Sequence, residues 1–426
     1  MTAIEFCDRA PIENVISTLT TAPDKIIFVG EGKAAKRFFN AHKAYIEDKK
    51  LGITIDFKSI KKNDLSSIVE TLSDIVEKED SCVFDLTGGE DLALVAMGIV
   101  YEKYSHKDIQ LQRFIIENGV VTDCDNDQRV IYSGAPLLSV DDHILIHGGA
   151  VRYKKDEMVK TVRWELTDDF VKTVKFLWEI ARKDPQKWNN QSAVLAYLNN
   201  YASDNEPLSI SVDLAEVEAK FEGFTTKYVD VKPLLKLLFE NDVISEYSHK
   251  GSVISFSYKD GLTAKCIKTA GAMLELKVLV TAAELKDENG KPYYNDALSG
   301  VFIDWDGAFH GARDEKADTE NEIDVVLMKG LVPVFISCKN GKFEEEELYK
   351  LDAVASRFGG KYVKKVLIAT DLGSLSDKTK EALSQRAVDM DISILRGVHK
   401  IDDDSKFAEM LRSLTGKGTR AQMIEF

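Results

Sequence analysis

The segment EIDVVLMKGLVPVFISCKNG, residues 322–341, places charged side chains inside two apolar runs that are typical of β-strands. Because strand side chains alternate between faces, Glu322 and Asp324 share one face of the first run. Ser337 and Lys339 share one face of the second run for the same reason. A charged residue inside such a strand needs water, a partner or a metal ion. The pattern therefore predicts a polar site on a hairpin, built from both strands.

A third carboxylate that could join this site lies on a predicted helix. The apolar spacing predicts one long helix over residues 264–285, and Glu275 lies in the middle of its apolar face. A carboxylate there needs a cation or a hydrogen-bonding partner, and a metal ion shared with Asp324 would serve. Structural explanations stay open: Glu275 could pair with Lys268 or Lys339. Asp324 could cap a strand end, and Lys339 could extend along a sheet edge.

In this order, the charged residues resemble the motif of the PD-(D/E)xK nuclease superfamily. Its core is a helix, a three-stranded sheet and a helix, with a Glu on the first helix, then an Asp, then a (D/E)xK strand. The resemblance implies that Glu275 and Asp324 bind a metal ion and that Lys339 orients or activates the attacking water. It implies Mg²⁺ or Mn²⁺, which suit hard oxygen ligands, and hydrolysis of phosphodiester bonds.

One position departs from that motif. Ser337 stands where the superfamily has its second acid, and a neutral hydroxyl is a weak metal ligand. Some members carry the missing acid on the following helix, so we expect Asp352, or else Glu347, to replace it as a metal ligand. Glu322 is another candidate because it shares a face with Asp324. An active site is expected, and a degenerate one is the alternative.

The first third of the chain has a different pattern. Short apolar runs (AIEFC, KIIFVG, ITIDFKSI, SCVFDLTG and LQRFII) alternate with segments whose apolar residues recur every three or four positions. This alternation predicts a doubly wound, Rossmann-like α/β domain over residues 1–150. Two further runs, RVIYSG and HILIHGG, are predicted to form a closing hairpin or edge strands.

Turns at the carboxyl ends of these strands could bind phosphate through backbone amides. The turn Thr87-Gly88-Gly89 follows one strand, and VGEGKAAKRF, with three basic residues, follows another. Neither contains the G-x-G-x-x-G fingerprint, which argues against the third hypothesis for the function, a nicotinamide-dependent oxidoreductase. Tight turns that bind no ligand are the structural alternative.

The whole arrangement resembles the CARF-domain nucleases that accompany type III CRISPR systems. It combines a Rossmann-like domain containing DLTGG, a helical middle, and a C-terminal NEIDVVL…ISCKNG motif. The resemblance implies a homodimer whose two CARF domains form one pocket for cyclic tetra-adenylate, which activates the nuclease domains. Ligand contacts are then expected from loops after the strands, with His147 as a weaker candidate. The expected ligand-binding residues are Cys7, Asp8, Arg9, Ala10, Gly30, Glu31, Gly32, Thr87, Gly88, Gly89 and Asp91.

Two more domains are predicted after the first. Residues 151–260 contain helices followed by the strand pair ISEYS and SVISFSYKD, which is typical of a winged-helix-like module, although a linker of packed helices fits equally. Residues 261–426 form a second α/β domain, which carries the nuclease motif. The alternative function is a non-catalytic cyclic-nucleotide sensor that binds DNA through Lys232, Lys236 and Lys250.

Composition limits the remaining choices. The 426 residues carry a formal net charge of -15, so any nucleic-acid contact, with DNA or RNA, must use local basic patches. Residues 1–150 hold 16 Lys and Arg against 25 Asp and Glu, and this net charge of -9 opposes the binding of an anionic ligand. Five scattered cysteines without a CxxC motif argue against a disulfide framework or a zinc ribbon. No apolar run is long enough to cross a bilayer, so a cytoplasmic protein without membrane contact is expected.

Overall fold

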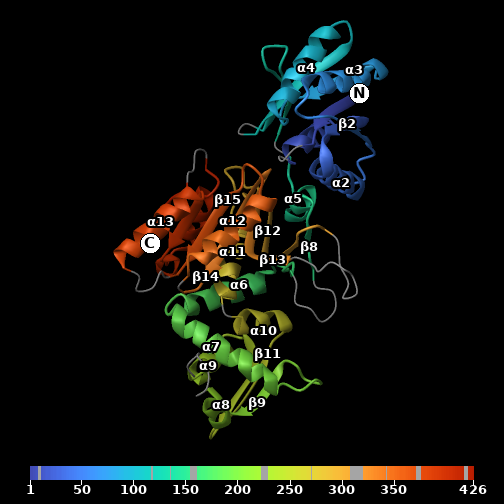
Figure 1. Ribbon diagram of the computed structural model, residues 1–426. Coiled ribbons are helices and arrows are strands. Elements are labelled where there is room, and N and C mark those ends of the chain that lie inside the picture. The colour runs from blue at the N-terminus through green and yellow to red at the C-terminus, as the bar shows by residue number, and fades with distance from the viewer. Residues whose placement is uncertain are drawn as a thin grey trace.

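The structure is a computed structural model, and it describes residues 1–7, 11–116, 119–134, 136–153, 161–221, 229–269, 271–307, 320–341, 343–370, 376–416 and 421–426. Three bodies follow one another along the molecule (Figure 1). The N-terminal α/β body lies at one end, the C-terminal α/β body in the centre, and the helical module at the other end. The predicted fold class is confirmed, but the middle third of the sequence lies at one end of the molecule in space.

A seven-stranded sheet with the order β3-β2-β1-β4-β5-β6-β7 forms the first body. Its strands are β1 (Thr2–Phe6), β2 (Lys25–Gly30), β3 (Thr54–Ser59), β4 (Ser81–Asp85), β5 (Asp108–Ile115), β6 (Val120–Asp123) and β7 (Arg129–Ser133). The strands from β3 to β5 are parallel, and β6 and β7 add antiparallel partners. The buried strands are apolar on both faces because helices cover both sides.

The helices of this body divide between the two faces of the sheet. They are η1 (Glu13–Val15), α1 (Ile16–Thr20), α2 (Gly32–Asp48), α3 (Leu65–Lys78) and α4 (Asp91–Lys103). Buried residues of η1, α1 and α2 belong to one apolar cluster, and those of α3 and α4 belong to another. This is the doubly wound arrangement that the alternating pattern predicted.

One predicted strand is wrong. HILIHGG does not form an edge strand; it belongs to helix α5 (Val140–Ile146), whereas RVIYSG does form the strand β7. The helix begins there because Ser139 and Asp142 form a capping box, each side chain hydrogen-bonded to the backbone of the other. After it, β8 (Ala150–Val151) pairs with the C-terminal sheet.

The module at the far end has its own apolar core. It contains α6 (Asp168–Ala181), α7 (Pro185–Leu198), η2 (Asn199–Tyr201), β9 (Ser209–Asp213), α8 (Leu214–Phe221), α9 (Lys232–Glu240), β10 (Ile244–Lys250) and β11 (Val253–Tyr258). The predicted hairpin is confirmed, because β10 pairs antiparallel with β11, and β9 adds a third strand. A small sheet packed on helices is consistent with a winged-helix-like module.

A second seven-stranded sheet, with the order β17-β16-β15-β14-β13-β12-β8, forms the central body. It contains β12 (Asp296–Asp304), β13 (Glu320–Lys329), β14 (Val332–Lys339), β15 (Lys364–Ala369), β16 (Ile392–Arg396) and β17 (Met423–Glu425). Its helical elements are α11 (Ala272–Glu284), α12 (Glu346–Phe358), α13 (Asp377–Asp389), η3 (Val398–Lys400) and α14 (Asp404–Ser413). Helix α10 (Gly261–Lys268) instead packs in the apolar core of the far module, so that module extends past the predicted boundary at residue 260. Helices α11 and α14 pack on one face, and α12 and α13 pack on the other.

The long helix predicted over residues 264–285 is two helices. Gly271 has a φ of 92°, a left-handed conformation that ends α10 and lets α11 start in a new direction. Glu275 therefore lies in the first turn of α11 and not in the middle of a long helix. Among the described helices, none is long and apolar enough to cross a membrane.

Candidate functional site

A cleft of about 310 Å³ opens between β13, β14 and α12. We call it the carboxylate cleft. The four predicted strand residues, Glu322, Asp324, Ser337 and Lys339, all line it, as does Glu347 from α12. The alternation argument thus placed these side chains on the correct common face.

Asp324 lies where the two strands of the hairpin part. The antiparallel register runs from Lys329 and Val332 to Val325 and Ile336. Next to that pair, the Asp324 carboxylate accepts the backbone N–H of Cys338 at 2.6 Å and the hydroxyl of Ser337 at 3.2 Å. A side chain thus takes the place of a ladder hydrogen bond, which anchors one carboxylate oxygen at the floor of the cleft.

Three carboxylates, those of Glu275, Glu322 and Asp324, have raised pKa values. Burial, followed by the charges of Asp324 and Glu322, raises the pKa of Glu275 to about 8. Burial and then Asp324 also raise the pKa of Glu322. Burial raises the pKa of Asp324 too, although Lys339 and the two hydrogen bonds oppose that rise. The charges of Asp324 and Glu322 thus act on Glu275, although only the first two of these three acids line the cleft.

The donor types in the cleft fit a hard divalent cation. Carboxylate oxygens are the ligands that Mg²⁺ and Mn²⁺ prefer, and a cation would relieve the repulsion that raises these pKa values. Within the described ranges, no three His, Cys, Asp or Glu side chains already form a group that could hold a metal ion. Glu275, Glu322 and Asp324 would therefore have to move closer together to bind one.

Lys339 is held by acids on two sides. Its ammonium lies 2.7 Å from Glu347 and 3.9 Å from Asp324, and 29% of the side chain is exposed. Burial lowers the pKa of Lys339, but the hydrogen bond to Glu347 and the charge of Asp324 outweigh it, so the pKa is raised. The side chain is therefore a fixed positive charge at neutral pH.

The acids proposed to replace Ser337 are not equally placed. Glu322 and Glu347 line the cleft, but Asp352 does not. The Asp352 carboxylate instead accepts a hydrogen bond from Lys365 of β15 at 2.8 Å. Asp352 therefore lies apart from the other metal-ligand candidates, because its carboxylate faces β15.

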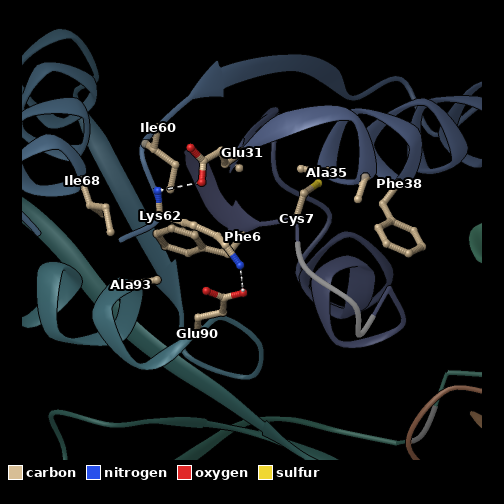
Figure 2. Close-up of a pocket in the computed structure, with 12 residues that line it drawn as sticks. Phe6, Cys7, Glu31, Ala35, Phe38, Ile60, Lys62, Ile68, Glu90 and Ala93 are labelled. Carbon is tan, nitrogen blue, oxygen red and sulfur yellow. Dashed lines mark hydrogen bonds and ion pairs between the residues drawn. The ribbon is translucent and has the colours of Figure 1, made fainter. Parts of the chain in front are cut away.

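A second cavity, of about 140 Å³, lies in the first body at the carboxyl ends of β1 and β2 (Figure 2). Sheet order reverses nearby, between β1 and β4, and such switch points are common ligand sites. Three predicted ligand residues line the cavity: Cys7, Gly30 and Glu31. The other lining residues are mostly apolar, and Phe6, Ala35, Phe38 and Ile68 are among them.

The charged groups at this cavity are already paired. Figure 2 shows Lys62 between two acids. Its backbone N–H donates to Glu31 at 3.2 Å, and its ammonium donates to Glu90 at 3.1 Å. An anionic ligand that displaced Glu90 would leave the Lys62 ammonium free to bind phosphate.

The remaining predicted ligand residues fall into two groups. Asp8, Arg9 and Ala10 lie outside the described residues. The others do not line the cavity: Gly32 begins α2, and Asp91 begins α4. Thr87 supports its own turn, because its hydroxyl donates to Asp85 and accepts the N–H of Phe114.

Gly88 and Gly89 have structural reasons for lacking side chains. A Cβ on Gly88 would lie 2.8 Å from the side-chain oxygen of Asn14, and Gly89 has a φ of 106°. His147 is buried away from the cavity, with its Nδ1 on the carbonyl oxygen of His143. The carbonyl oxygen of His147 instead accepts a hydrogen bond from Arg357 of the central body.

Two residues near the cavity were missed from the sequence. Lys62 follows β3, so the rule that selected loops after β1, β2 and β4 could also have selected it. Asn14 is fully buried, and its amide has no hydrogen-bond partner among the described residues. Nothing in the sequence distinguishes Asn14 from an ordinary helix-start residue.

The lysines of the far module give limited support to a DNA-binding surface. Lys232 lies 3.8 Å from Asp230, just before its helix, and Lys236 lies 3.7 Å from Glu240 of the same helix, so both lysines already face acids. The module contacts the carboxylate cleft instead through α7. The side-chain amide of Asn340, the residue after Lys339, donates to the side-chain oxygen of Asn189, and the Asn189 amide donates to the backbone carbonyl oxygen of Asn340.

No protein-family model matches this chain, and no curated protein matches it either. Solved structures do share its fold. Protein VC1899 from Vibrio cholerae superposes with a TM-score of 0.71 at 15% identity, over 98% of this chain and 99% of that one. Can2 from Sulfobacillus thermosulfidooxidans, solved in complex with cyclic tetra-adenylate, superposes with a TM-score of 0.61 at 16% identity, over 97% and 96%. The chain therefore has the fold of Can2 along almost its whole length.

Proposed function

We propose that this chain is a metal-dependent nuclease that cyclic tetra-adenylate activates, and that it acts in the cytoplasm in type III CRISPR antiviral defence. The observation that carries the proposal is the carboxylate cleft, which Asp324 and Lys339 line and whose charges act on the buried Glu275; the three residues follow the chain order of the PD-(D/E)xK motif. The shared fold with Can2, which was solved with cyclic tetra-adenylate, supports the choice of activator.

The residues of the cleft have distinct roles in this proposal. Glu275, Asp324 and Glu322 would hold Mg²⁺ or Mn²⁺, which would supply charge stabilisation at the scissile phosphate and lower the pKa of a bound water. Ser337 is not a ligand but fixes the Asp324 carboxylate by donating its hydroxyl. Lys339, whose pKa is raised, contributes a positive charge that orients the water or binds the phosphate.

The size of the first cavity supports a homodimer. A volume of about 140 Å³ is below the 300–1,000 Å³ that is usual for a drug-sized ligand, and cyclic tetra-adenylate is larger still. One protomer would therefore bind only part of the ligand, with Cys7, Gly30, Glu31 and Lys62 at its contact. Two copies related by a two-fold axis would present the same loops twice to a ligand of matching symmetry.

The test is cleavage of plasmid DNA, labelled single-stranded DNA and labelled RNA with Mg²⁺ or Mn²⁺, with and without cyclic tetra-adenylate. Cutting by wild type that requires both the metal and the ligand, and that Lys339→Ala abolishes, is the expected result. Calorimetry measures ligand binding to the same preparations. Tight binding without cutting of any substrate would contradict the nuclease and favour the sensor with a degenerate site, which the neutral residue at Ser337 supports.

A further inference from the structure

Helix α12 connects the carboxylate cleft to the first body. Its first turn carries Glu347, whose carboxylate bonds to two lysines. One oxygen lies 2.7 Å from the ammonium of Lys339, and the other lies 3.1 Å from that of Lys350. Only 22% of the Glu347 side chain is exposed. Both oxygens are therefore engaged with cations of the chain, which suits a residue that holds Lys339 better than a metal ligand.

The last turn of the same helix is held by α5 from the first body. The ring Nε2 of His143 lies 2.7 Å from the carbonyl oxygen of Phe358. In the other direction, Arg357 donates to the carbonyl oxygen of His147 at 2.7 Å and to that of Trp305 at 3.2 Å. A Cβ on Gly149 would lie 2.5 Å from the Phe358 ring, so the two segments pack as closely as glycine allows.

The element η1 of the first body reaches the same end of α12. Tyr362, four residues beyond the helix, donates its hydroxyl to Glu13 at 3.3 Å, and Lys361 pairs with Glu13 at 3.5 Å. Glu13 belongs to η1, the element that follows the β1 loop, and Cys7 at the start of that loop lines the first cavity. We call the contacts of α5 and η1 with residues 357–362 the joint.

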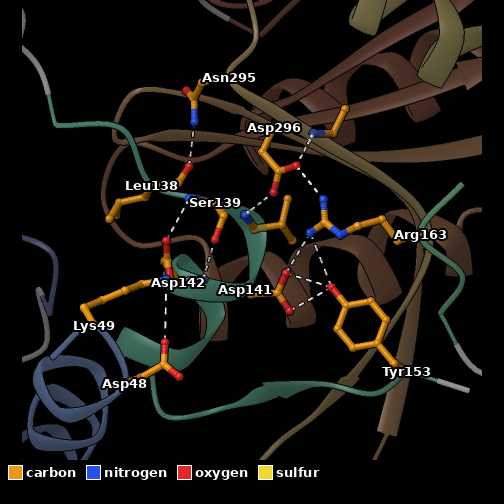
Figure 3. Close-up of polar contacts among 12 residues, drawn as sticks. Asp48, Lys49, Leu138, Ser139, Asp141, Asp142, Tyr153, Arg163, Asn295 and Asp296 are labelled. Carbon is orange, nitrogen blue, oxygen red and sulfur yellow. Dashed lines mark hydrogen bonds and ion pairs between the residues drawn. The ribbon is translucent and has the colours of Figure 1, made fainter. Parts of the chain in front are cut away.

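Helix α5 is fixed to both bodies, so it can transmit a displacement (Figure 3). On one side, Lys49 of α2 pairs with Asp142 at 2.6 Å. On the other, the N–H of Val140 donates to Asp296 of β12 at 2.8 Å, and Arg163 bridges Asp141 and Asp296 at 2.9 and 3.0 Å. One apolar cluster runs without a break from the first sheet through α5 to α12. Close-packed interiors of this kind pass strain on rather than absorb it.

We propose that Glu347 is a positioning residue for Lys339, and that the ligand state of the first body sets its position through the joint and α12. The helix has 13 residues without Gly or Pro, so it spans about 20 Å as one rigid rod. A shift at its last turn must therefore move Glu347, and with it the ammonium of Lys339. This inference rests on the proposed function and names how the site is regulated.

The first experiment compares Glu347→Gln with Glu346→Gln in the full-length protein. Glu346 is the matched control, because it is the neighbouring acid and its side chain is exposed. Its carboxylate lies 3.2 Å from the ammonium of Lys350, which is also exposed. We expect the Glu347 variant to lose about 100-fold in kcat with the ligand present, because the lysine is misplaced. The metal concentration for half-maximal rate and the ligand Kd stay unchanged, and Glu347→Asp restores part of kcat. The control loses less than about 2-fold.

The second experiment breaks the joint with Glu13→Gln and Tyr362→Phe. We expect the ratio of cleavage rates with and without cyclic tetra-adenylate to fall about tenfold, while the ligand Kd is retained. Hydrogen exchange of α12 gives a readout that needs no cleavage. In wild type the ligand changes exchange over residues 346–358, and in the joint variants that change is lost.

The possible outcomes distinguish the role of Glu347, the transmission through α12 and the proposed function. If Glu347→Gln raises the metal requirement as strongly as Asp324→Asn does, Glu347 is a metal ligand and the positioning role is wrong. If the joint variants keep the full activation ratio and the full exchange response, α12 does not transmit the signal. If wild type binds no cyclic tetra-adenylate or cuts nothing, the proposed function fails instead, and that result is seen before any variant is made.

Discussion

The carboxylate cleft and the joint both bury ionisable groups, but they do so in opposite ways. In the cleft, burial and mutual repulsion raise the pKa of Glu275, Glu322 and Asp324. In the joint, burial lowers the pKa of His147 to about 4 and that of His143 well below 6.5. A bound cation would relieve the first arrangement, whereas the second holds neutral rings in an apolar core, each with one ring nitrogen hydrogen-bonded to a backbone carbonyl. The comparison separates a region suited to chemistry from one suited to rigid transmission.

The largest expected effect is on cleavage alone. Lys339→Ala or Asp324→Ala should reduce the cleavage rate by at least about 1,000-fold, because each removes a charge at the reacting phosphate. The affinity for cyclic tetra-adenylate, measured by calorimetry, should be unchanged because the first cavity lies in another body. Loss of ligand binding in both variants would show that the two regions are not separable.

The joint should respond to a change in size rather than charge. Gly149→Ala places a Cβ within 2.8 Å of the Asp304 carbonyl oxygen and closer still to the Phe358 ring. We expect a loss of about 2 kcal/mol in the free energy of unfolding, measured by urea denaturation. Gly251→Ala is a steric control, because a Cβ there meets nothing within 4 Å, although its φ of 62° adds strain. Equal losses for both variants would contradict close packing at the joint.

The pH dependence of stability should have opposite signs in the two regions. Glu275 has a pKa of about 8 in the folded state, above its ordinary value of 4.5, so the folded state binds the extra proton between these values. Stability from this group therefore falls as the pH rises through that window. The pKa of His147 is about 4 in the folded state, against an ordinary value of 6.5. The stability that this group contributes therefore falls as the pH drops below about 6.5.

Thermal melting of metal-free protein from pH 4 to pH 9 measures both slopes. Glu275→Gln should flatten the alkaline side only, and adding Mg²⁺ should raise the melting temperature most at high pH, where the carboxylates are ionised. An alkaline slope that is the same in wild type and Glu275→Gln would mean that Glu275 is not the group responsible.

The smallest effect is expected at the pair that Asp352 of α12 forms with Lys365. Asp352→Asn removes the partner of Lys365 but touches neither the cleft nor the joint, so cleavage should change by less than about 3-fold. A large rise in the metal requirement of this variant would instead support Asp352 as the acid that replaces Ser337.

Much of this arrangement could be predicted from the sequence, because local periodicity determines it. Strand alternation was enough to place Glu322, Asp324, Ser337 and Lys339 on one face, and the α/β rhythm of the first domain was also recovered. The errors arose where a single residue overrides the pattern. Gly271 breaks a helix that the apolar spacing predicts to be continuous, and the Ser139 capping box turns a strand-like run into α5.

The contacts between bodies could not be predicted at all. The sequence makes His147 a weaker ligand candidate because glycines follow it, whereas in the fold Gly149 allows this segment to pack against Phe358. The choice between Glu347 and Asp352 also depends on which neighbour each carboxylate meets, and both are acids on the same helix. Such pairings arise from tertiary packing, which no spacing rule encodes.

The pairing of β8 with β12 has a consequence for how the chain is synthesised. Arg152, next to β8, and Asp304 of β12 form an ion pair across 152 residues of sequence. The module between them has its own core and can fold as a unit while the ribosome is still translating the central body. The pairing of β8 with β12 can form only after β12 has been translated, and long-range pairing of this kind is slow. We therefore expect β8 and α5 to dock last during folding, so that the central body is coupled to the first body only after translation is nearly complete.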